Sequence, residues 1–487
     1  MTLQATTETL SMFVDGAWVS ASGDERFAAT SPSTGETIAT VPSGTRADAA
    51  RAVDAASKAF PGWAGRSSFE RAAILERVVG VIEARRNELA RTLSLDQGKP
   101  LHAEAYDEVD ELAAYFRMAA ADATRLEGLM PPAVDPAKRV LVYRVPLGVV
   151  GVVSPWNWPY TMPGELIAPA LGAGNTVVWN AATNTSVCAV RLAECLADAE
   201  LPRGVFNLVT GPGSVVGDAI VGHPATAGVG FIGSTDTGRR IAERAAGKEL
   251  LLEMGGNGPL VVLGDADLDA AVAATLTACF LNAGQSCTAG ERVLVQQSVH
   301  DAYLERLRDA IGREIRLGDP FDPDTTMGPL NNEEARAKTE RHVGDAVDRG
   351  ASLVTGGAPH RSRGNGLFYE ATVLDAVTDE MEIARDETFG PVVPITSIGG
   401  VDEAIGIVNA SPYGLLAAIF TSDLRTGIRF AESVRAGWVN INEGTNYWES
   451  HLPFGGRAGS QSGVGRVGGR FTMERFTEHK TVVVNLA

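Results

Sequence analysis

The sequence predicts an α/β protein with two doubly wound parallel-sheet domains and an additional β element. Between residues 140 and 255, short runs rich in valine, leucine and isoleucine alternate with helix-like stretches, and the alternation resumes after Pro259. Continuously apolar strands are typical of parallel sheets that helices cover on both faces through right-handed connections. The C-terminal run HKTVVVNL is strand-like without a local partner, which indicates the third, β-rich element.

The first 125 residues divide into a strand-like part and a helical part. Residues 13–45 alternate short apolar runs with turn residues, so we expect short strands in an N-terminal arm. From residue 47 to about 125, apolar side chains recur three and four positions apart, which predicts helices. Pro61 and the Gly98-Lys99-Pro100 segment interrupt this helical pattern.

Two series of alternating elements follow. The run VLVYRVPLGVVGVVSPW at 140–156 is β-branched and predicts a strand. In the first series we expect helices at 164–173, 186–198, 214–222 and 236–247, each leading into an apolar strand. In the second we expect helices at 267–284 and 298–314, with strands from PLVVL to LLAAIF.

Composition and charge exclude several classes of function. The chain has 487 residues and a net charge of −18, without a dense run of lysine or arginine, so we expect no nucleic-acid partner. No stretch is long and apolar enough for a membrane span, and the first residues lack the pattern of a signal peptide. The four cysteines form no C-x-x-C pair, so no metal site is expected. We therefore expect a cytoplasmic protein with reduced thiols.

Two motifs carry candidate reactive groups. In GQSCTAGER, Cys287 follows an apolar helix and is flanked by small residues, so the thiol has the access that a nucleophile needs. In LLLEMGGNGP, Glu253 ends an apolar strand before two glycines, at the sheet edge where open α/β sheets place their sites. Each has an ordinary alternative, a buried structural cysteine and a solvated glutamate.

Two further motifs carry candidate hydrogen-bond donors. In SPWNWPYTMPGE, prolines and tryptophans stiffen the turn around Asn157, whose amide is suited to hold a developing oxyanion. Its ordinary alternative is a helix cap. In FIGSTDTG, residues 231–238, a strand leads through Gly233 and Ser234 into a helix, and the free N–H groups there are suited to bind a pyrophosphate.

In the order PWN, GST, EMGG and GQSC, these motifs resemble those of the aldehyde dehydrogenase superfamily along essentially the whole chain. DQGKP, GNTVVW, LPRGVFNLVTG, ETFGPV and FGG…SGVGR support the resemblance. It implies that Cys287 is the nucleophile and forms a thiohemiacetal and then a thioester. It also implies that Asn157 and the Cys287 N–H hold the oxyanion, and that Glu253 is the general base for hydrolysis.

The resemblance also implies the domain roles and a nicotinamide cofactor. Residues 1–125 and 145–255 would bind the cofactor, 256–450 would form the catalytic domain, and 126–144 with 476–487 would assemble a homodimer or homotetramer. The residues expected at the cofactor are Trp156, Asn180, Thr183, Gly233, Ser234, Glu387 and Phe389. Asn180 replaces the family's usual lysine, which disfavours a 2′-phosphate, whereas the small Thr183 tolerates one. We favour NAD, with NADP as the alternative.

The substrate pocket is predicted from residues around the catalytic motifs and a late loop. These are Trp158, Met162, Glu165, Ser286, Thr288, Trp448 and Phe454. Tryptophans favour an uncharged or cationic aldehyde, and Glu165 would repel an anionic one if it faces the pocket. The loop from Arg457 to Gln461 is longer than usual in the family, so contacts there are not carried over.

Several alternatives stay open. A CoA-acylating aldehyde dehydrogenase would pass the acyl group to CoA, although Glu253 favours hydrolysis. A semialdehyde dehydrogenase would take an anionic substrate, for which SPWNWPYTMPGE lacks an arginine. A non-catalytic structural member would not need the intact Cys287, Glu253 and Asn157. An unrelated cysteine hydrolase would need a histidine close to Cys287.

Overall fold

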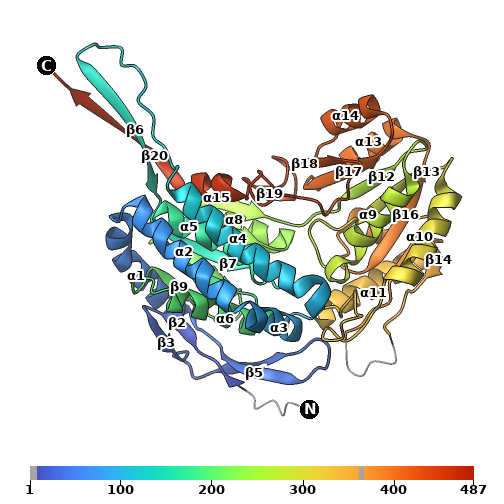
Figure 1. Cartoon of the computed structure of the whole chain (residues 1–487), viewed down its shortest axis with the longest axis horizontal. Helices are drawn as coiled ribbons and strands as arrows, with labels where there is room; N and C mark the ends of the chain where they lie inside the picture. The colour runs from blue at the N-terminus through green and yellow to red at the C-terminus, as the bar shows by residue number, and fades with distance from the viewer. Residues whose placement is uncertain (1–7, 361–366) are drawn as a thin grey trace.

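The computed structural model describes residues 8–360 and 367–487, so the ends of the predicted ranges at 1–7 and the segment 361–366 lie outside the described residues. The chain forms two α/β lobes, each built on one large sheet, and a two-stranded ribbon that projects from the first lobe (Figure 1). The predicted fold class, with two doubly wound domains and a β element, is confirmed.

The first lobe contains an eight-stranded sheet in the order β19-β11-β10-β7-β8-β9-β2-β3. Its central five strands are parallel, whereas β2, β3 and β19 are antiparallel additions at the two edges. The strands are β2 (Met12–Val14), β3 (Ala17–Val19), β7 (Val149–Ser154), β8 (Thr176–Ala181), β9 (Phe206–Leu208), β10 (Thr226–Ile232), β11 (Glu249–Glu253) and β19 (Gly463–Val464). The predicted N-terminal arm is therefore partly an extension of this sheet.

The remaining N-terminal strands form a separate small sheet in the order β1-β5-β4. Its strands are β1 (Glu8–Thr9), β4 (Arg26–Thr30) and β5 (Thr37–Pro42). The helices of the first lobe are α1 (Arg46–Ala64), α2 (Ser68–Ala84), α3 (Arg86–Asp96), the π-helix η1 (Leu101–Ala105), α4 (Tyr106–Ala123), α5 (Thr161–Ala173), η2 (Thr183–Thr185), α6 (Ser186–Asp198), α7 (Val216–Gly222), α8 (Thr235–Arg244) and α15 (Gly469–Arg475).

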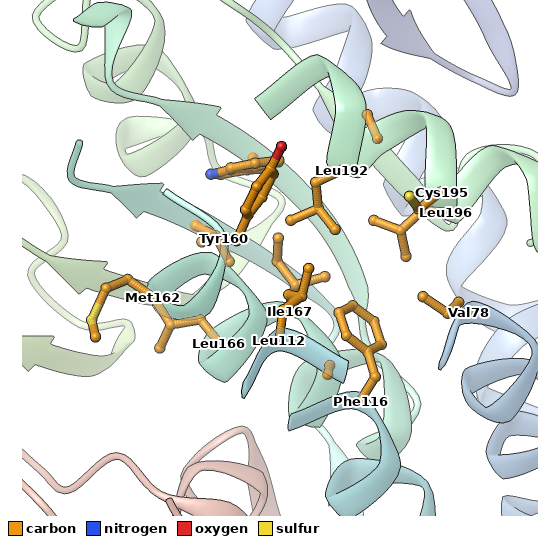
Figure 2. Close-up of a cluster of buried hydrophobic side chains, with 14 of the residues drawn as sticks. Val78, Leu112, Phe116, Tyr160, Met162, Leu166, Ile167, Leu192, Cys195 and Leu196 are labelled. Atoms are coloured by element: carbon orange, nitrogen blue, oxygen red, sulfur yellow. The ribbon is translucent and has the colours of Figure 1, made fainter. Parts of the chain in front are cut away.

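Helices cover both faces of the first sheet because alternate strand residues point to opposite sides. Val150 and Val177 pack into one cluster with α2, α4, α5 and α6, whereas Val149 and Val178 pack into another with α1 and α7. Figure 2 shows part of the first cluster, with side chains from several helices meeting in the core: Val78, Leu112, Phe116, Tyr160, Met162, Leu166, Ile167, Leu192, Cys195 and Leu196. This packing fixes α4 and α5 relative to each other.

The second lobe contains a seven-stranded sheet in the order β14-β15-β16-β13-β12-β17-β18, with β14 antiparallel to its neighbour. Its strands are β12 (Pro259–Val262), β13 (Arg292–Gln296), β14 (Ser352–Thr355), β15 (Thr372–Asp375), β16 (Val392–Ile398), β17 (Leu416–Phe420) and β18 (Trp438–Ile441). Its helical segments are α9 (Leu268–Phe280), η3 (Leu281–Gly284), α10 (His300–Glu314), α11 (Glu333–Asp348), α12 (Glu382–Arg385), α13 (Val401–Ala410) and α14 (Leu424–Ser433).

The ribbon pairs two distant parts of the chain. Strand β6 (Lys138–Pro146) runs antiparallel to β20 (Thr477–Asn485) over its whole length. The single strand expected at 140–156 is in fact two strands, β6 and β7, in different sheets. They separate at Gly148, whose φ of +136° lies in a region that favours glycine.

The expected helix 267–284 is also shorter in the structure. Regular helix ends at Phe280, and Asn282 and Ala283 have φ values of +51° and +54°. Tertiary contacts hold this strained turn, because the Asn282 N–H donates to the Glu104 carboxylate at 3.1 Å and its side-chain amide donates to the Asn157 carbonyl at 3.0 Å. Local periodicity carries no signal for such contacts.

Candidate active site

Two cavities meet at Cys287 and Glu253. One, of about 430 Å³, is lined by the residues at the start of α8 and is called here the α8 cavity. The other, of about 400 Å³, is lined by side chains of η1 and α4 and is called the α4 cavity. Cys287, Glu253 and Met162 line both, so a group in either cavity reaches the same thiol.

The strained turn after α9 presents Cys287 at this junction. Its side chain is partly exposed, whereas the other three cysteines are buried. Asn157 lies beside the turn, and its Nδ2 donates to the Gln285 carbonyl at 3.1 Å. That bond uses one of the two amide hydrogens, and Asn157 also lines the α8 cavity.

Glu253 is the last residue of β11 and is buried beside the thiol. Its Oε1 has no hydrogen-bond partner in the described part of the chain. Burial and the neighbouring Glu165 raise the pKa of this carboxyl well above its usual value. Burial and Glu253 likewise raise the pKa of the Cys287 thiol. Both shifts favour the neutral form of the group that undergoes them.

The α8 cavity contains a cradle for an anion. Gly233, at φ +158°, lets the chain turn against the Phe231 ring, where an added Cβ would lie only 2.7 Å from a ring atom. Ser234 caps α8 and accepts from the Thr237 N–H at 3.4 Å. Gly233, Ser234 and Thr237 line the cavity at the start of α8, and the N-terminus of a helix suits the pyrophosphate of a dinucleotide.

The ETFGPV segment, residues 387–392, also lines the α8 cavity through Glu387 and Phe389. Trp156 and Phe389 meet edge to face with their ring centres 5.5 Å apart, and the Glu387 carboxylate accepts from the Gly256 N–H at 2.9 Å. Glu291, which the sequence did not point to, accepts from the backbone N–H groups of Thr388 and Phe389 at 2.7 and 2.8 Å. It thereby holds the segment in place.

The two residues expected at the adenosine end of the cofactor differ in placement. Asn180 lines the α8 cavity, and its Nδ2 donates to the carbonyls of Val209 and Gly211 at 3.0 and 3.1 Å. Thr183 is not among the residues that line this cavity, and its hydroxyl donates to Asn184 at 3.4 Å. The amide oxygen of Asn180 thus has no hydrogen-bond partner in the part of the chain that the structure describes.

All of the residues predicted at the substrate line the α4 cavity: Trp158, Met162, Glu165, Ser286, Thr288, Trp448 and Phe454. Glu165 is 1% exposed and accepts from the Tyr115 hydroxyl at 3.1 Å. Burial and the neighbouring Glu111 raise its pKa to about 8. Glu165 is thus buried in the wall of the α4 cavity.

Sequence reasoning missed an acidic wall and one cation of this cavity. The wall consists of Glu104, Asp107, Glu108 and Glu111, and the cation is Lys99. The Lys99 ammonium lies 2.5 Å from a Glu108 oxygen and 3.6 Å from the centre of the Trp158 ring. The spacing of the carboxylates in AEAYDEVDEL could have indicated the acidic wall. Residues three and four positions apart lie on the same face of a helix.

The described ranges contain neither a cluster of metal ligands nor a membrane-spanning helix. No group of three or more histidine, cysteine or acidic side chains is placed to hold a metal ion in residues 8–360 and 367–487. Over the same residues, no helix has the length and apolar character that crossing a membrane requires.

The aldehyde dehydrogenase family model matches residues 18–482, and the chain belongs to that family. It is 38% identical to 3-sulfolactaldehyde dehydrogenase of Pseudomonas putida, over 96% of each chain. It is 37% identical to the NADP-dependent succinate-semialdehyde dehydrogenase GabD of Escherichia coli and 37% identical to betaine aldehyde dehydrogenase of Bacillus subtilis, over 97% of each chain.

Solved structures agree with this assignment. An NAD-dependent aldehyde dehydrogenase from Sinorhizobium meliloti has a TM-score of 0.95 at 37% identity, covering 99% of this chain and 96% of its own. An NADP-dependent enzyme from E. coli has a TM-score of 0.95 at 36% identity, covering 98% of each chain. The protein is an NAD(P)-dependent oxidoreductase that converts an aldehyde to a carboxylic acid.

Proposed function

We propose that the chain oxidises a cationic aldehyde through a thioester on Cys287. The Cys287 sulfur adds to the aldehyde carbonyl, and the second Nδ2 hydrogen of Asn157 and the Cys287 N–H stabilise the oxyanion. A bound dinucleotide supplies a hydride acceptor at the nicotinamide. Gly233 and Ser234 would hold its pyrophosphate, Trp156 and Phe389 would contribute to the wall of its site, and Glu387 would bind the ribose beside the nicotinamide.

Glu253 completes the reaction as the general base. Its carboxylate takes a proton from water, the oxygen of that water adds to the thioester carbonyl, and the carbon–sulfur bond breaks. The products are a carboxylic acid and the Cys287 thiolate, which takes up a proton. The unpartnered Oε1 of Glu253 beside the thiol supports this role, because it leaves an acceptor for the attacking water.

The buried carboxyl of Glu165 in the α4 cavity wall carries the substrate assignment. Lys99 is the only basic side chain among the described residues that line this cavity, and it is already paired with Glu108. An anionic substrate would meet carboxylates without a free cation, whereas a cationic one would gain a partner. The relatives named above act on both kinds of aldehyde, so this choice rests on the cavity alone.

We favour NAD as the cofactor. A 2′-phosphate needs cations, yet Asn180 offers an amide oxygen, which accepts a hydrogen bond from a ribose hydroxyl. The one basic side chain among the described residues lining the α8 cavity is Lys338, on the same side as Glu387. NADP remains the alternative.

We further propose that the β6–β20 ribbon assembles a homodimer or homotetramer. Val483 and Leu486 on β20 and just after it are 58% and 60% exposed, and Leu129 beside β6 is 65% exposed. Apolar side chains on a projecting ribbon are buried most simply against a second copy. Light scattering at two protein concentrations would measure the assembly, and a monomer at both would contradict it.

The test of the activity is NADH or NADPH formation with cationic, neutral and anionic aldehydes of similar length. We expect the highest kcat/KM with a cationic aldehyde and NAD. Cys287→Ala should lower turnover by at least about 10⁴-fold while it retains cofactor binding. A preference for succinate semialdehyde would overturn the substrate assignment. A requirement for CoA in product formation would overturn hydrolysis.

A further inference from the structure

We propose that Glu111 and Glu165 form a two-carboxylate site that selects the primary ammonium group of an amino aldehyde over a quaternary one. This inference rests on the proposed function, which requires only a positive charge on the substrate. The site lies in the α4 cavity, where α4 and α5 pack together in the core of the first lobe.

These two carboxyls have hydrogen-bonding capacity that the protein does not use. Both oxygens of Glu108 are engaged, because one pairs with Lys99 at 2.5 Å and the other accepts from the Tyr160 N–H at 2.9 Å. Glu104 accepts from the Asn282 N–H. By contrast, Glu165 accepts only from Tyr115, and Glu111 has no hydrogen bond or ion pair within the described ranges.

The aromatic side chains of the cavity are already engaged. The face of Trp158 carries the Lys99 ammonium at 3.6 Å, so a second cation there would be repelled. The Trp448 ring packs against Phe454 and Tyr115, with ring centres 5.7 and 6.4 Å apart. A quaternary ammonium relies on open aromatic faces because it has no N–H donor, whereas a primary ammonium donates hydrogen bonds to carboxylates.

The electrostatics of the pair also favour a small cation. Burial and Glu111 raise the pKa of Glu165, and burial and Glu108 raise the pKa of Glu111, so without a cation both carboxyls favour their protonated forms near neutral pH. The other groups that act on them are Tyr115 on Glu165, and Lys99 and Asp107 on Glu111. An ammonium between the two carboxyls would replace these protons and allow both groups to ionise.

The experiment compares two matched substrate pairs with the wild-type protein and NAD. Aminopropanal is compared with butanal, its uncharged isostere, and trimethylammoniopropanal with its own neutral isostere, dimethylpentanal. We expect kcat/KM for aminopropanal to exceed that for butanal by at least about tenfold. The quaternary aldehyde should show a much smaller advantage over dimethylpentanal.

Glu111→Gln and Glu165→Gln then test the two carboxyls. Each should lower the aminopropanal-to-butanal ratio by about tenfold, and the ratio is independent of how much active protein remains. Asp110→Asn, an exposed carboxylate on α4 paired with Arg86, is the matched control and should leave the ratio within about twofold.

The outcomes separate this inference from the proposed function. An equal or larger advantage for the quaternary aldehyde would overturn the two-carboxylate site but keep a cationic substrate. An unchanged ratio in both glutamine variants would also overturn the site. No advantage for either cation over its neutral isostere would overturn the cationic substrate itself.

Discussion

Glu291 accepts the backbone N–H of Phe389 at 2.8 Å, and that residue has a φ of +61°. Phenylalanine rarely adopts this conformation, so it persists only where the surroundings hold it. The second oxygen of the same carboxylate binds the Thr388 N–H at 2.7 Å. One buried side chain thus fixes the segment that carries both Glu387 and Phe389 to the wall of the α8 cavity.

Glu291→Gln should weaken this hold, because an amide offers one acceptor oxygen where the carboxylate offers two. We expect KM for the cofactor to rise by about five- to tenfold, with a smaller change in kcat for a saturated enzyme. Steady-state kinetics with varied NAD would measure it. Glu305→Gln, on the exposed face of α10, is the control, and a cofactor KM equal to that of wild type would contradict the positioning role.

Glu253→Gln should separate hydride transfer from hydrolysis. The neutral amide does not take a proton from water, so one equivalent of NADH should form rapidly before turnover stalls. Stopped-flow absorbance and mass spectrometry of the acylated Cys287 peptide would detect the burst and the trapped thioester. Steady-state turnover at the wild-type rate would count against Glu253 as the base.

The lobes and their order along the chain were predictable because buried parallel strands have a simple apolar signature. Helix 186–198 was placed correctly to the residue. The left-handed turn at Asn282 and Ala283 was not predicted, because its cause lies in contacts with Glu104 and Asn157, far away in the sequence. Secondary-structure patterns contain only the local part of that information.

The candidate site likewise contains some residues that the sequence predicts and others that it does not. Cys287, Glu253 and Asn157 lie in recognisable motifs, and the structure brings them to one junction. Glu291, Glu111 and Lys99 were missed as site residues, because charged side chains in a sequence are usually solvated. Only the packing of α4 against α5, and of the Phe389 segment against the start of β13, reveals what these groups face.

Asn180→Lys should shift the cofactor preference toward NADP. The substitution places a cation where the cavity now offers an amide oxygen, and a 2′-phosphate gains from that charge. We expect the ratio of kcat/KM for NADP to that for NAD to rise by about tenfold. Measurements with both cofactors at one ionic strength would test it, and Asn180→Gln controls for the longer side chain. An unchanged ratio would show that the residue at position 180 does not determine the preference between NADP and NAD.

The ammonium site also predicts how the substrate preference depends on pH. Burial together with the neighbouring glutamate raises the pKa of Glu165 to about 8, while the pKa of Glu111 rises to about 7 through burial and the nearby Glu108. Below these values the carboxyls are protonated and neutral, so an ammonium must displace protons to bind. The aminopropanal-to-butanal ratio of kcat/KM should therefore fall as the pH is lowered through 8 and then 7.

The ratio isolates this effect, because titration of Cys287 and Glu253 changes kcat/KM for both substrates alike. In Glu165→Gln the decline through pH 8 should disappear, since the amide does not titrate. Asp110→Asn should keep the wild-type profile. A ratio that is flat with pH in the wild type would mean that no carboxyl near the ammonium changes its charge in this range, and the two-carboxylate site would then be wrong.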